Sequence, residues 1–170
     1  MAIRTIITKE DGALLKHSRP ITEFNQRLHY LMDDLKDTLI RSGGVGLAAP
    51  QVAILRRAVV VLETNVENED DEYIIELINP EIIAVDGEQV GPEGCLSVPG
   101  EYGIVKRPGQ VTVRAQDRYG KTFEVTGTGI TARCFCHEID HLDGILFTQR
   151  AERMLSRDEL GGDASQEEDE

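Results

Sequence analysis

The sequence predicts an α+β fold, in which antiparallel β-sheets pack around a central metal-binding helix and a further helix lies near the N-terminus. Three observations lead to this prediction. Apolar residues recur at helical spacing in residues 22–41 and helical character returns in residues 129–142. Between these segments, short runs rich in Val, Ile and Thr alternate with turn residues, as in antiparallel sheets. Two histidines four positions apart lie in the second helical segment.

The N-terminal helix is predicted over residues 22–41. Its apolar positions lie three or four residues apart and would share one face: Leu28, Leu31, Met32, Leu35 and Leu39. Thr22 is available as the N-cap, and Gly43 followed by Gly44 provides a stop. We interpret His29 in this helix as an ordinary surface or boundary residue.

The strands follow in the middle of the chain, separated by turn residues and charged residues. They are predicted at residues 57–63, 73–79, 81–90, 102–107, 110–117 and 121–127. The acidic run 67–72 is interpreted as a solvated hairpin loop, and residues 117–121 as a tight turn. Residues 91–100, rich in Gly and Pro, are expected to form a loop between strands. The second helix then runs over residues 129–142, with Gly144 as its stop.

Length and composition indicate one domain. The chain has 170 residues, of which 40% are hydrophobic and 29% charged, and this is enough to bury a core without disulfides. We expect a single domain over residues 1–155. Residues 156–170 form an acidic tail, and we expect it to be disordered at least from residue 161 because it has almost no apolar side chains there.

Charge and cysteine content narrow the class of protein. The net charge of −13 argues against a DNA-binding protein with a basic face. The apolar runs are too short to cross a membrane, and residues 1–12 lack the apolar core of a signal peptide. Three cysteines, an odd number, indicate reduced thiols or metal ligands. We therefore expect a cytoplasmic protein with no membrane partner.

Residues 137–141 read HEIDH and are the first candidate site. On a helix, His137 and His141 lie one turn apart on one face, where two neutral imidazoles can bind one metal ion. Glu138 beside them could transfer a proton. The alternative is an amphipathic helix with two histidines on its solvated face, and these five residues alone do not decide between the two.

A catalytic zinc-type site needs a third protein ligand. In one class of metalloprotease this ligand is a histidine six residues after the second histidine, but that position is Phe147 here. Glu152 or Glu159 could serve in a protease of another class. Cys95 is the stronger candidate, because a thiolate binds borderline-soft divalent metals well and neighbouring glycines allow close approach. The alternative for Cys95 is a small buried apolar residue.

Residues 43–51, GGVGLAAPQ, are too poor in side chains for an ordinary core strand. Small residues in an extended segment suggest a backbone that lies against another chain, such as a peptide added as an extra strand. Gln51 ends the run with an amide that can donate to an oxygen. A solvent-facing glutamine after a turn is the alternative.

These three segments together resemble the peptide deformylase family. The family pattern Gly-hydrophobic-Gly-hydrophobic-Ala-Ala-x-Gln is matched by residues 44–51, Glu-Gly-Cys-Leu-Ser by residues 93–97, and His-Glu-x-Asp-His by residues 137–141. All three occur in the family's order and spacing, so the resemblance covers roughly residues 3–150. Two features depart from the family: Cys136 stands where Gln is frequent, and the tail is acidic where some members carry a basic segment used at the ribosome.

The resemblance implies a metal-dependent hydrolase that removes the N-formyl group from the formyl-methionine of new proteins and releases formate. Residues 1–155 would be its catalytic domain. Cys95, His137 and His141 would bind one divalent ion, with Fe2+ as the physiological metal and Zn2+, Ni2+ or Co2+ able to substitute. The expected partners are formyl-methionyl nascent peptides and, transiently, the ribosome, although the acidic tail argues against docking through the C-terminus.

The resemblance also implies roles for residues around the metal. Glu138 would take a proton from the attacking water and return it to the leaving amine. The side-chain amide of Gln51 and the backbone N–H of Leu96 would stabilise the oxyanion. The remaining residues are expected to contact the substrate, with Cys134 bordering the methionine pocket: Val45, Gly46, Glu93, Gly94 and Cys134.

Two rival hypotheses remain open from the residues. One is a metalloprotease that uses Glu152 or Glu159 as its third ligand. The other is a non-catalytic module with a closed structural site, in which Cys134 would be a fourth ligand beside Cys95 and the histidines. Removing the metal separates them, because a structural site would unfold and a catalytic one would mainly lose activity.

Overall fold

Five antiparallel strands form the larger of two sheets, in the order β1-β2-β3-β6-β7. The computed structural model describes residues 2–160. The strands are β1 (Gly46–Ala48), β2 (Ala58–Glu63), β3 (Tyr73–Asp86), β6 (Gln110–Gln116) and β7 (Thr122–Thr128). Within the described residues β1 pairs only with β2, so its other edge is open.

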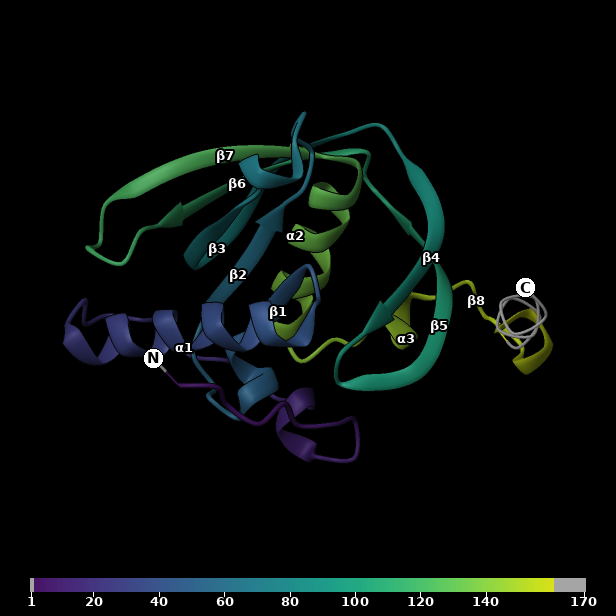
Figure 1. Cartoon of the computed structure of the whole chain (residues 1–170), viewed down its shortest axis with the longest axis horizontal. Coiled ribbons are helices and arrows are strands. Elements are labelled where there is room, and N and C mark those ends of the chain that lie inside the picture. The colour runs from purple at the N-terminus through teal and green to yellow at the C-terminus, as the bar shows by residue number, and fades with distance from the viewer. Residues whose placement is uncertain (1, 161–170) are drawn as a thin grey trace.

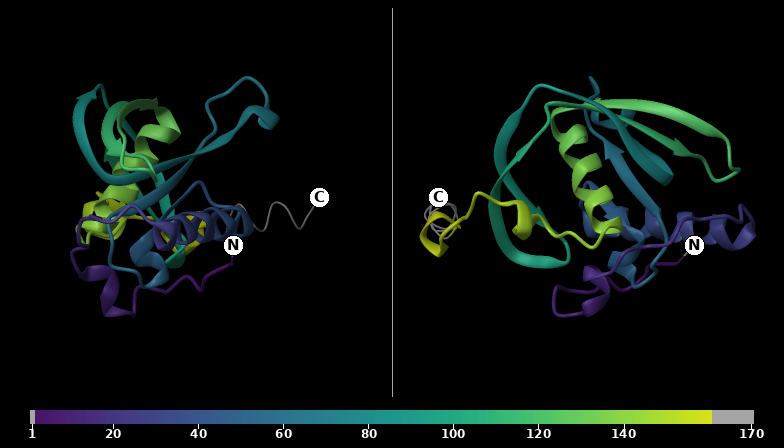
Figure 2. Two further views of the ribbon diagram at one scale, coloured as in Figure 1. Left: turned by 90° about the vertical axis from the view of Figure 1, so that its left-hand side faces the viewer. Right: turned by 180° about the vertical axis from the view of Figure 1, so that it is seen from behind.

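The smaller sheet lies on the other side of the central helix (Figure 1). Its strands are β4 (Gln89–Cys95), β5 (Val98–Arg107) and β8 (Arg153–Met154), in the order β4-β5-β8. Helix α2 (Gly129–Leu142) lies between the two sheets, and the view from behind shows the same arrangement (Figure 2). The predicted α+β fold, with antiparallel sheets around this helix, is confirmed.

The other helices cover the outside of the sheets. Helix α1 (Gln26–Ser42) packs on the face of the larger sheet that is turned away from α2. A short helix, α3 (Phe147–Arg150), follows α2 and packs near β5. Three 3-10 turns are also present: η1 (Gly12–Leu15), η2 (Ala49–Val52) and η3 (Glu69–Asp71).

Alternating residues of β2 separate two apolar clusters. Val59 and Val61 pack toward α2, whereas Ala58 and Val60 pack toward α1, as the period of two along a strand requires. We call the second group the α1 cluster; its other buried members include Leu35, Leu39, Leu47, Ala49 and Val52. A third group lies against the smaller sheet, and we call it the β5 cluster; its buried members are Leu14, Val98, Val105, Leu146 and Phe147.

The first helix begins four residues later than predicted. Asn25, not Thr22, is the N-cap, and its side chain accepts a hydrogen bond from the N–H of Leu28 at 3.1 Å. An asparagine three residues before the first buried leucine satisfies the helix terminus directly. The predicted stop is confirmed, because Gly43 caps the helix in the left-handed region with φ of 72°.

Pro80 does not divide two strands, contrary to the prediction of strands at residues 73–79 and 81–90. Strand β3 continues through it to Asp86, and β4 begins only at Gln89. The pairing of β3 with β6 accommodates the proline through a shift in register between Ile78 and Glu81. A bulge leaves the proline without a ladder bond to make, so the sheet continues.

The expected loop over residues 91–100 is also wrong. Strand β4 runs through to Cys95, and β5 starts at Val98, so only a tight turn joins them. Gly94 serves packing here, because a Cβ atom at that position would lie 2.5 Å from the ring of Tyr102 on the paired strand. The register shifts between Gly94 and Cys95, and this irregularity ends the strand at the cysteine.

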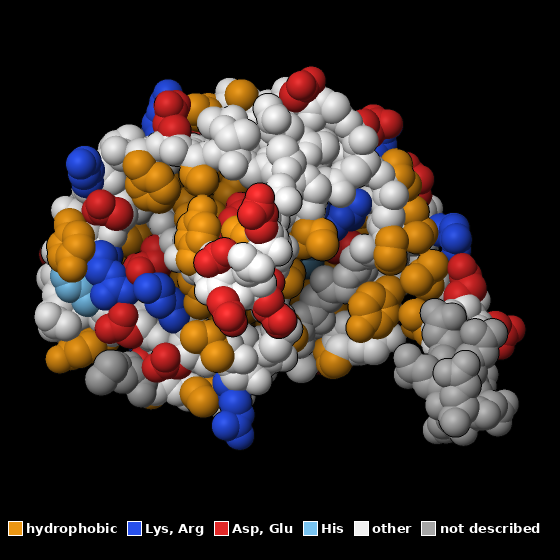
Figure 3. All heavy atoms as spheres, turned by 45° about the horizontal axis from the view of Figure 1, so that its top comes forward, with side chains coloured by type: hydrophobic (Ala, Val, Ile, Leu, Met, Phe, Trp, Pro, Cys, Tyr) orange, Lys and Arg blue, Asp and Glu red, His pale blue; other side chains and the backbone are white. Residues whose placement is uncertain are grey.

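The remaining local predictions agree with the structure where it describes them. Residues 67–72 lie in the connection between β2 and β3, and Figure 3 shows acidic side chains gathered on this protruding loop. Residues 117–121 turn between β6 and β7. The predicted disorder from residue 161 falls outside the described residues. Within residues 2–160, no helix has the length and apolar character needed to cross a membrane.

We predict that Gly144→Ala destabilises the fold more than the matched change Gly87→Ala. Both glycines have positive φ, at 75° and 65°, so each alanine costs about 1–2 kcal/mol of backbone strain. A Cβ atom at Gly144 would in addition lie 2.5 Å from the carbonyl oxygen of Leu15, whereas nothing lies within 4 Å at Gly87. Thermal unfolding measures the difference, and equal melting temperatures would contradict the prediction.

Candidate metal centre

Helix α2 carries the two histidines into the interior between the sheets. Gly129 starts the helix with φ of 56°, and Thr128 precedes it as the N-cap in extended conformation. His137 and His141 are 8% and 1% exposed, so the solvated-face alternative for this motif is excluded. The spacing of four residues brings their Nε2 atoms to 3.2 Å from one another.

Cys95 joins the histidines from the end of β4. Its Sγ lies 3.4 Å from the Nε2 of His141, and the three possible ligand atoms lie within 4.8 Å of one another. Within residues 2–160, this is the one group of three or more such side chains that could bind an ion. The structure therefore brings together the three residues that the sequence analysis selected as ligands.

The donor set fits a tetrahedral divalent ion. Bonds of about 2.0–2.1 Å to nitrogen and about 2.3 Å to sulfur would separate two nitrogens by roughly 3.3 Å and nitrogen from sulfur by roughly 3.6 Å. The observed separations are 3.2 Å between the imidazoles and 3.4 Å between Cys95 and His141. These two separations are close to those that an ion requires, so the three side chains fit a divalent ion.

Glu93 orients the first histidine. The Nδ1–H of His137 donates to the carboxylate of Glu93 at 2.7 Å, which turns Nε2 toward the metal position. Arg107 donates to both oxygens of the same carboxylate, at 3.1 and 2.7 Å, and Arg133 donates at 2.9 Å. Burial alone would raise the pKa of Glu93, but the hydrogen bonds from His137 and Arg107 outweigh it and lower the pKa to about 2. A contact between Glu93 and substrate stays a prediction, and both oxygens of its carboxylate are engaged by these partners.

The sequence did not predict that arginine side chains would bind the carboxylate of Glu93. Arg107, 5% exposed, also donates to Asp140 at 2.9 Å, and Asp140 pairs with Arg150. The position of Asp140 between the two histidines of the motif was the available signal, because an acid on a buried helix needs a partner. Its partner comes from the end of β5, 33 residues earlier in the chain.

Gln51 is buried and points toward the metal position. Only 1% exposed, it lies in η2 directly after β1, so the solvent-facing alternative is excluded. Its Oε1 accepts from the N–H of Ala48 at 2.9 Å. Its Nε2 donates to the hydroxyl of Ser97 at 3.1 Å and lies 3.6 Å from the Sγ of Cys95. Since the oxygen is held by the backbone, the amide hydrogens are directed toward Ser97 and Cys95, at the candidate ligand group.

A cavity of about 590 Å³ opens beside these groups. Gly46 on the edge strand β1 passes so close to α2 that a Cβ atom would collide with Cys134 and Glu138. Gly46 therefore brings β1 next to Cys134 and Glu138 on the wall of the cavity. The expected substrate contacts all line the cavity together with Leu96: Val45, Gly46, Glu93, Gly94 and Cys134.

Glu138 lies beside the ligand group without being part of it. The residue is 3% exposed, its Oε1 has no hydrogen-bond partner, and Oε1 is 4.0 Å from the Nε2 of His141. Burial raises the pKa of this carboxyl to about 7, against the opposing charge of His137. A carboxyl with a pKa in this range can both accept and return a proton at neutral pH.

The structure gives no support to the rival ligands. Cys134 is outside the ligand group; burial raises the pKa of its thiol well above the usual value, and the thiol donates to the carbonyl of Val45 at 3.4 Å. Glu159 pairs with Arg153 on the surface, and Glu152 is exposed beside β5. The protease and closed-site hypotheses therefore lack their required ligands among the described residues.

Comparison with known proteins identifies the family. The family model described as polypeptide deformylase matches residues 3–157. The chain belongs to the peptide deformylase family. A peptide deformylase from Caldicellulosiruptor bescii is 51% identical over 160 residues, which cover 94% of this chain and 92% of the relative. Peptide deformylase 1 of Bacillus subtilis is 46% identical over 160 residues, with 94% and 97% covered.

Solved deformylase structures share the fold over most of the chain. A crystal structure of a peptide deformylase from Legionella pneumophila has a TM-score of 0.81 and 39% identity, and covers 99% of both chains. A Met-Ala-Ser-bound class I type b peptide deformylase from Acinetobacter baumannii has a TM-score of 0.80 and 33% identity, with 88% of this chain and 98% of the other covered. Peptide deformylases are metal-dependent hydrolases that remove the N-formyl group from nascent peptides, and this is the activity of the chain.

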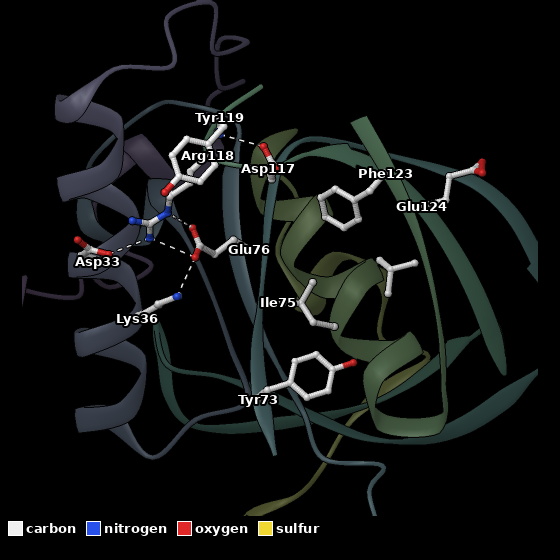
Figure 4. Close-up of a pocket in the computed structure, with 11 residues that line it drawn as sticks. Asp33, Lys36, Tyr73, Ile75, Glu76, Asp117, Arg118, Tyr119, Phe123 and Glu124 are labelled. Atoms are coloured by element: carbon white, nitrogen blue, oxygen red, sulfur yellow. Dashed lines mark hydrogen bonds and ion pairs between the residues drawn. The ribbon is translucent and has the colours of Figure 1, made fainter. Parts of the chain in front are cut away.

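The deformylase has a second depression that shares no residue with the cavity at the metal position. It lies between α1, β3 and the hairpin of β6 and β7 (Figure 4). There Arg118 bridges the hairpin to Glu76 and Asp33, at 2.9 and 2.8 Å, and Lys36 also pairs with Glu76. These ion pairs connect the hairpin to α1, and we assign the depression no part in the reaction.

We predict that Cys95→Ser sharply lowers the metal content of the deformylase, because a serine hydroxyl is a much weaker ligand than a thiolate. Glu152→Ala and Glu159→Ala serve as controls and should keep the metal content of the unchanged chain. Metal bound per chain after purification measures the effect. Loss of metal in either glutamate variant, with Cys95→Ser unaffected, would move the third ligand to the protease arrangement.

Proposed function

We propose that Cys95, His137 and His141 bind one divalent ion at which the N-formyl group of a formyl-methionyl peptide is hydrolysed. The observation that carries this proposal is the convergence of three ligand atoms within 4.8 Å, directly beside a buried carboxyl, Glu138, with a free oxygen. This arrangement supplies a ligand set, a base and an open cavity in one place.

The peptide would lie in extended form along the open edge of β1. Backbone groups of Val45 and Gly46 can pair with it as a further strand, while Gly94 allows close approach from the other side. Cys134 would border the methionine side chain, since its uncharged thiol lies at the floor of the cavity. The similar structure from Acinetobacter baumannii has Met-Ala-Ser bound, which supports a short methionyl peptide as a ligand of this chain.

Each protein group then has one role in the reaction. The ion, when bound, polarises the formyl carbonyl and lowers the pKa of the attacking water. Glu138 takes the proton of that water and returns it to the leaving amine, which releases formate and a free N-terminus. The amide of Gln51 and the N–H of Leu96 stabilise the oxyanion. Glu93 keeps His137 oriented through the bond to Nδ1.

We propose Fe2+ as the physiological ion, with Zn2+, Ni2+ or Co2+ able to substitute. A set of one thiolate and two imidazoles accepts all four, and intrinsic affinity favours the later metals over iron. The support for iron is membership of the family. Chain purified without oxygen should contain iron as its principal metal and should be more active than chain reloaded with Zn2+; a zinc-containing chain of equal or higher activity would contradict this.

We propose that the enzyme works in the cytoplasm on nascent chains and does not use residues 156–170 to contact the ribosome. This segment carries seven acids and one arginine, so ribosomal RNA would repel it. Residues 1–155 would then form the single catalytic domain.

Truncation after Ser156 should leave both the melting temperature and the turnover of a short formyl-peptide unchanged, because the removed segment has too few apolar side chains to pack. Thermal unfolding and an assay for released formate measure the two quantities. A clear fall in either would show that the segment docks on the catalytic domain.

Glu138→Gln tests the central role. The change keeps the shape of the side chain and removes the basic oxygen, so turnover should fall by about 10²–10⁴-fold, the usual range for a lost general acid–base group. Metal content and melting temperature should stay at the values of the unchanged chain, and a formyl-peptide should still bind. Formate release and metal content are measured on the same sample.

Two outcomes would contradict this assignment. Near-normal turnover of Glu138→Gln would remove the residue from the reaction. Loss of metal in that variant would make Glu138 a ligand, and the ligand set would have to be revised.

A further inference from the structure

Residues 6–18 run beneath the sheets and α1, along the bottom of the molecule in Figure 1. We call this segment the N-terminal strap. We propose that the strap is a positioning element that sets the spacing between the amide of Gln51 and the backbone N–H of Leu96. The inference rests on the oxyanion-binding roles proposed above for these two groups.

The strap connects the segments that carry the two donors. The N–H of Ile7 donates to the carbonyl of Gln51 at 2.8 Å, and the N–H of Lys9 donates to the carbonyl of Ser97 at 2.9 Å. Gln51 follows the larger sheet, and Ser97 lies in the turn between β4 and β5 of the smaller one. No ladder joins the two sheets in the described chain.

Side chains anchor the strap in both halves of the molecule. Ile6 packs against the α1 cluster, whereas Ile7 packs against the β5 cluster. Leu14, further along, is fully buried in the β5 cluster. Since neighbouring residues insert into different clusters, the strap cannot move relative to one half without disturbing its contacts with the other.

The same strap reaches the end of the helix that carries the histidines. The N–H of Ser18 donates to the carbonyl of Leu142 at 2.8 Å, directly after His141. The carbonyl of Leu15 lies against Gly144, where a Cβ atom would not fit. All three motif segments are therefore held by one piece of chain.

A small displacement of the strap would also displace the amide of Gln51 and the N–H of Leu96. The Nε2 of Gln51 contacts the hydroxyl of Ser97 at 3.1 Å, so η2 and the turn after Cys95 meet directly at the site. Donors stabilise an oxyanion only when they lie about 2.7–3.1 Å from it. A misplacement of about 1 Å can cost on the order of 10²-fold in rate.

Lys9→Pro tests the strap with little disturbance to its backbone. Lys9 is the second residue of a turn closed by a 2.9 Å bond from the N–H of Asp11 to the carbonyl of Thr8, and proline is favoured at that position. The change removes the N–H that binds Ser97. Lys9→Ala is the matched control, because it removes the ion pair with Glu101 and keeps the N–H.

Lys9→Pro should lower kcat per metal-loaded chain by about tenfold, with KM, metal content and melting temperature close to those of Lys9→Ala. A strap with only a structural role would lower the melting temperature and the metal content and leave kcat per metal-loaded chain unchanged, and this result would overturn the inference. Ile7→Ala is a second probe, which keeps every N–H and weakens the anchor in the β5 cluster. Ile7→Ala should also lower kcat while KM stays nearly unchanged. If Lys9→Pro does not fold, an unchanged kcat in Ile7→Ala would overturn the inference.

A double-mutant cycle shows whether the strap acts through the oxyanion donors. If it does, the loss caused by Lys9→Pro should be clearly smaller in a Gln51→Ala background, because neighbours that share one role are not additive. Equal losses in both backgrounds would overturn the inference. Gln51→Ala alone separates the two proposals: unchanged kcat in that variant refutes the proposed role of Gln51, whereas a loss there with unchanged kcat in Lys9→Pro refutes only the strap.

Discussion

The site depends on one constraint, which is that helix α2 buries three ionisable side chains within two turns. His137, Glu138 and His141 are each less than 10% exposed, and burial of unpaired charge is costly. A second layer of charge meets this cost at His137, whereas Oε1 of Glu138 and Nδ1 of His141 have no hydrogen-bond partner among the described residues. Glu93 binds His137, and Arg107 binds Glu93 and Asp140, so each charged group of this layer has a partner of opposite sign.

That arrangement also explains why two carboxylates near one metal position behave differently. Glu93 is surrounded by hydrogen-bond donors, which hold its pKa at about 2, and it stays ionised to orient a ligand. Glu138 has an unpartnered oxygen, and burial raises its pKa to about 7, which suits it to proton transfer. The difference comes from the donors around each group, because both side chains are glutamates on the wall of one cavity.

Each of the two sheets contributes different groups to the site. The larger sheet supplies an open edge at β1 and the amide of Gln51, whereas the smaller sheet supplies Cys95 and the turn that contains Leu96. Helix α2 fills the space between them and contributes His137 and His141. Close packing is possible because Gly46 has no side chain where β1 approaches Cys134. Contacts that cross between the sheets therefore determine how accurately the groups meet.

Local chemistry in the sequence was enough to predict the strands, the second helix and the three motifs, because period, capping glycines and ligand types act over a few residues. The same local signals failed where distant contacts decide. The N-cap of α1 is Asn25 and not Thr22. Strand β3 continues through Pro80 by a shift in register. Gly94 lies in a strand and packs against Tyr102. Only the tertiary structure revealed that Arg107 and Asp140 support the metal position, since a buried ion pair forms between residues 33 positions apart and leaves no periodic trace in the chain.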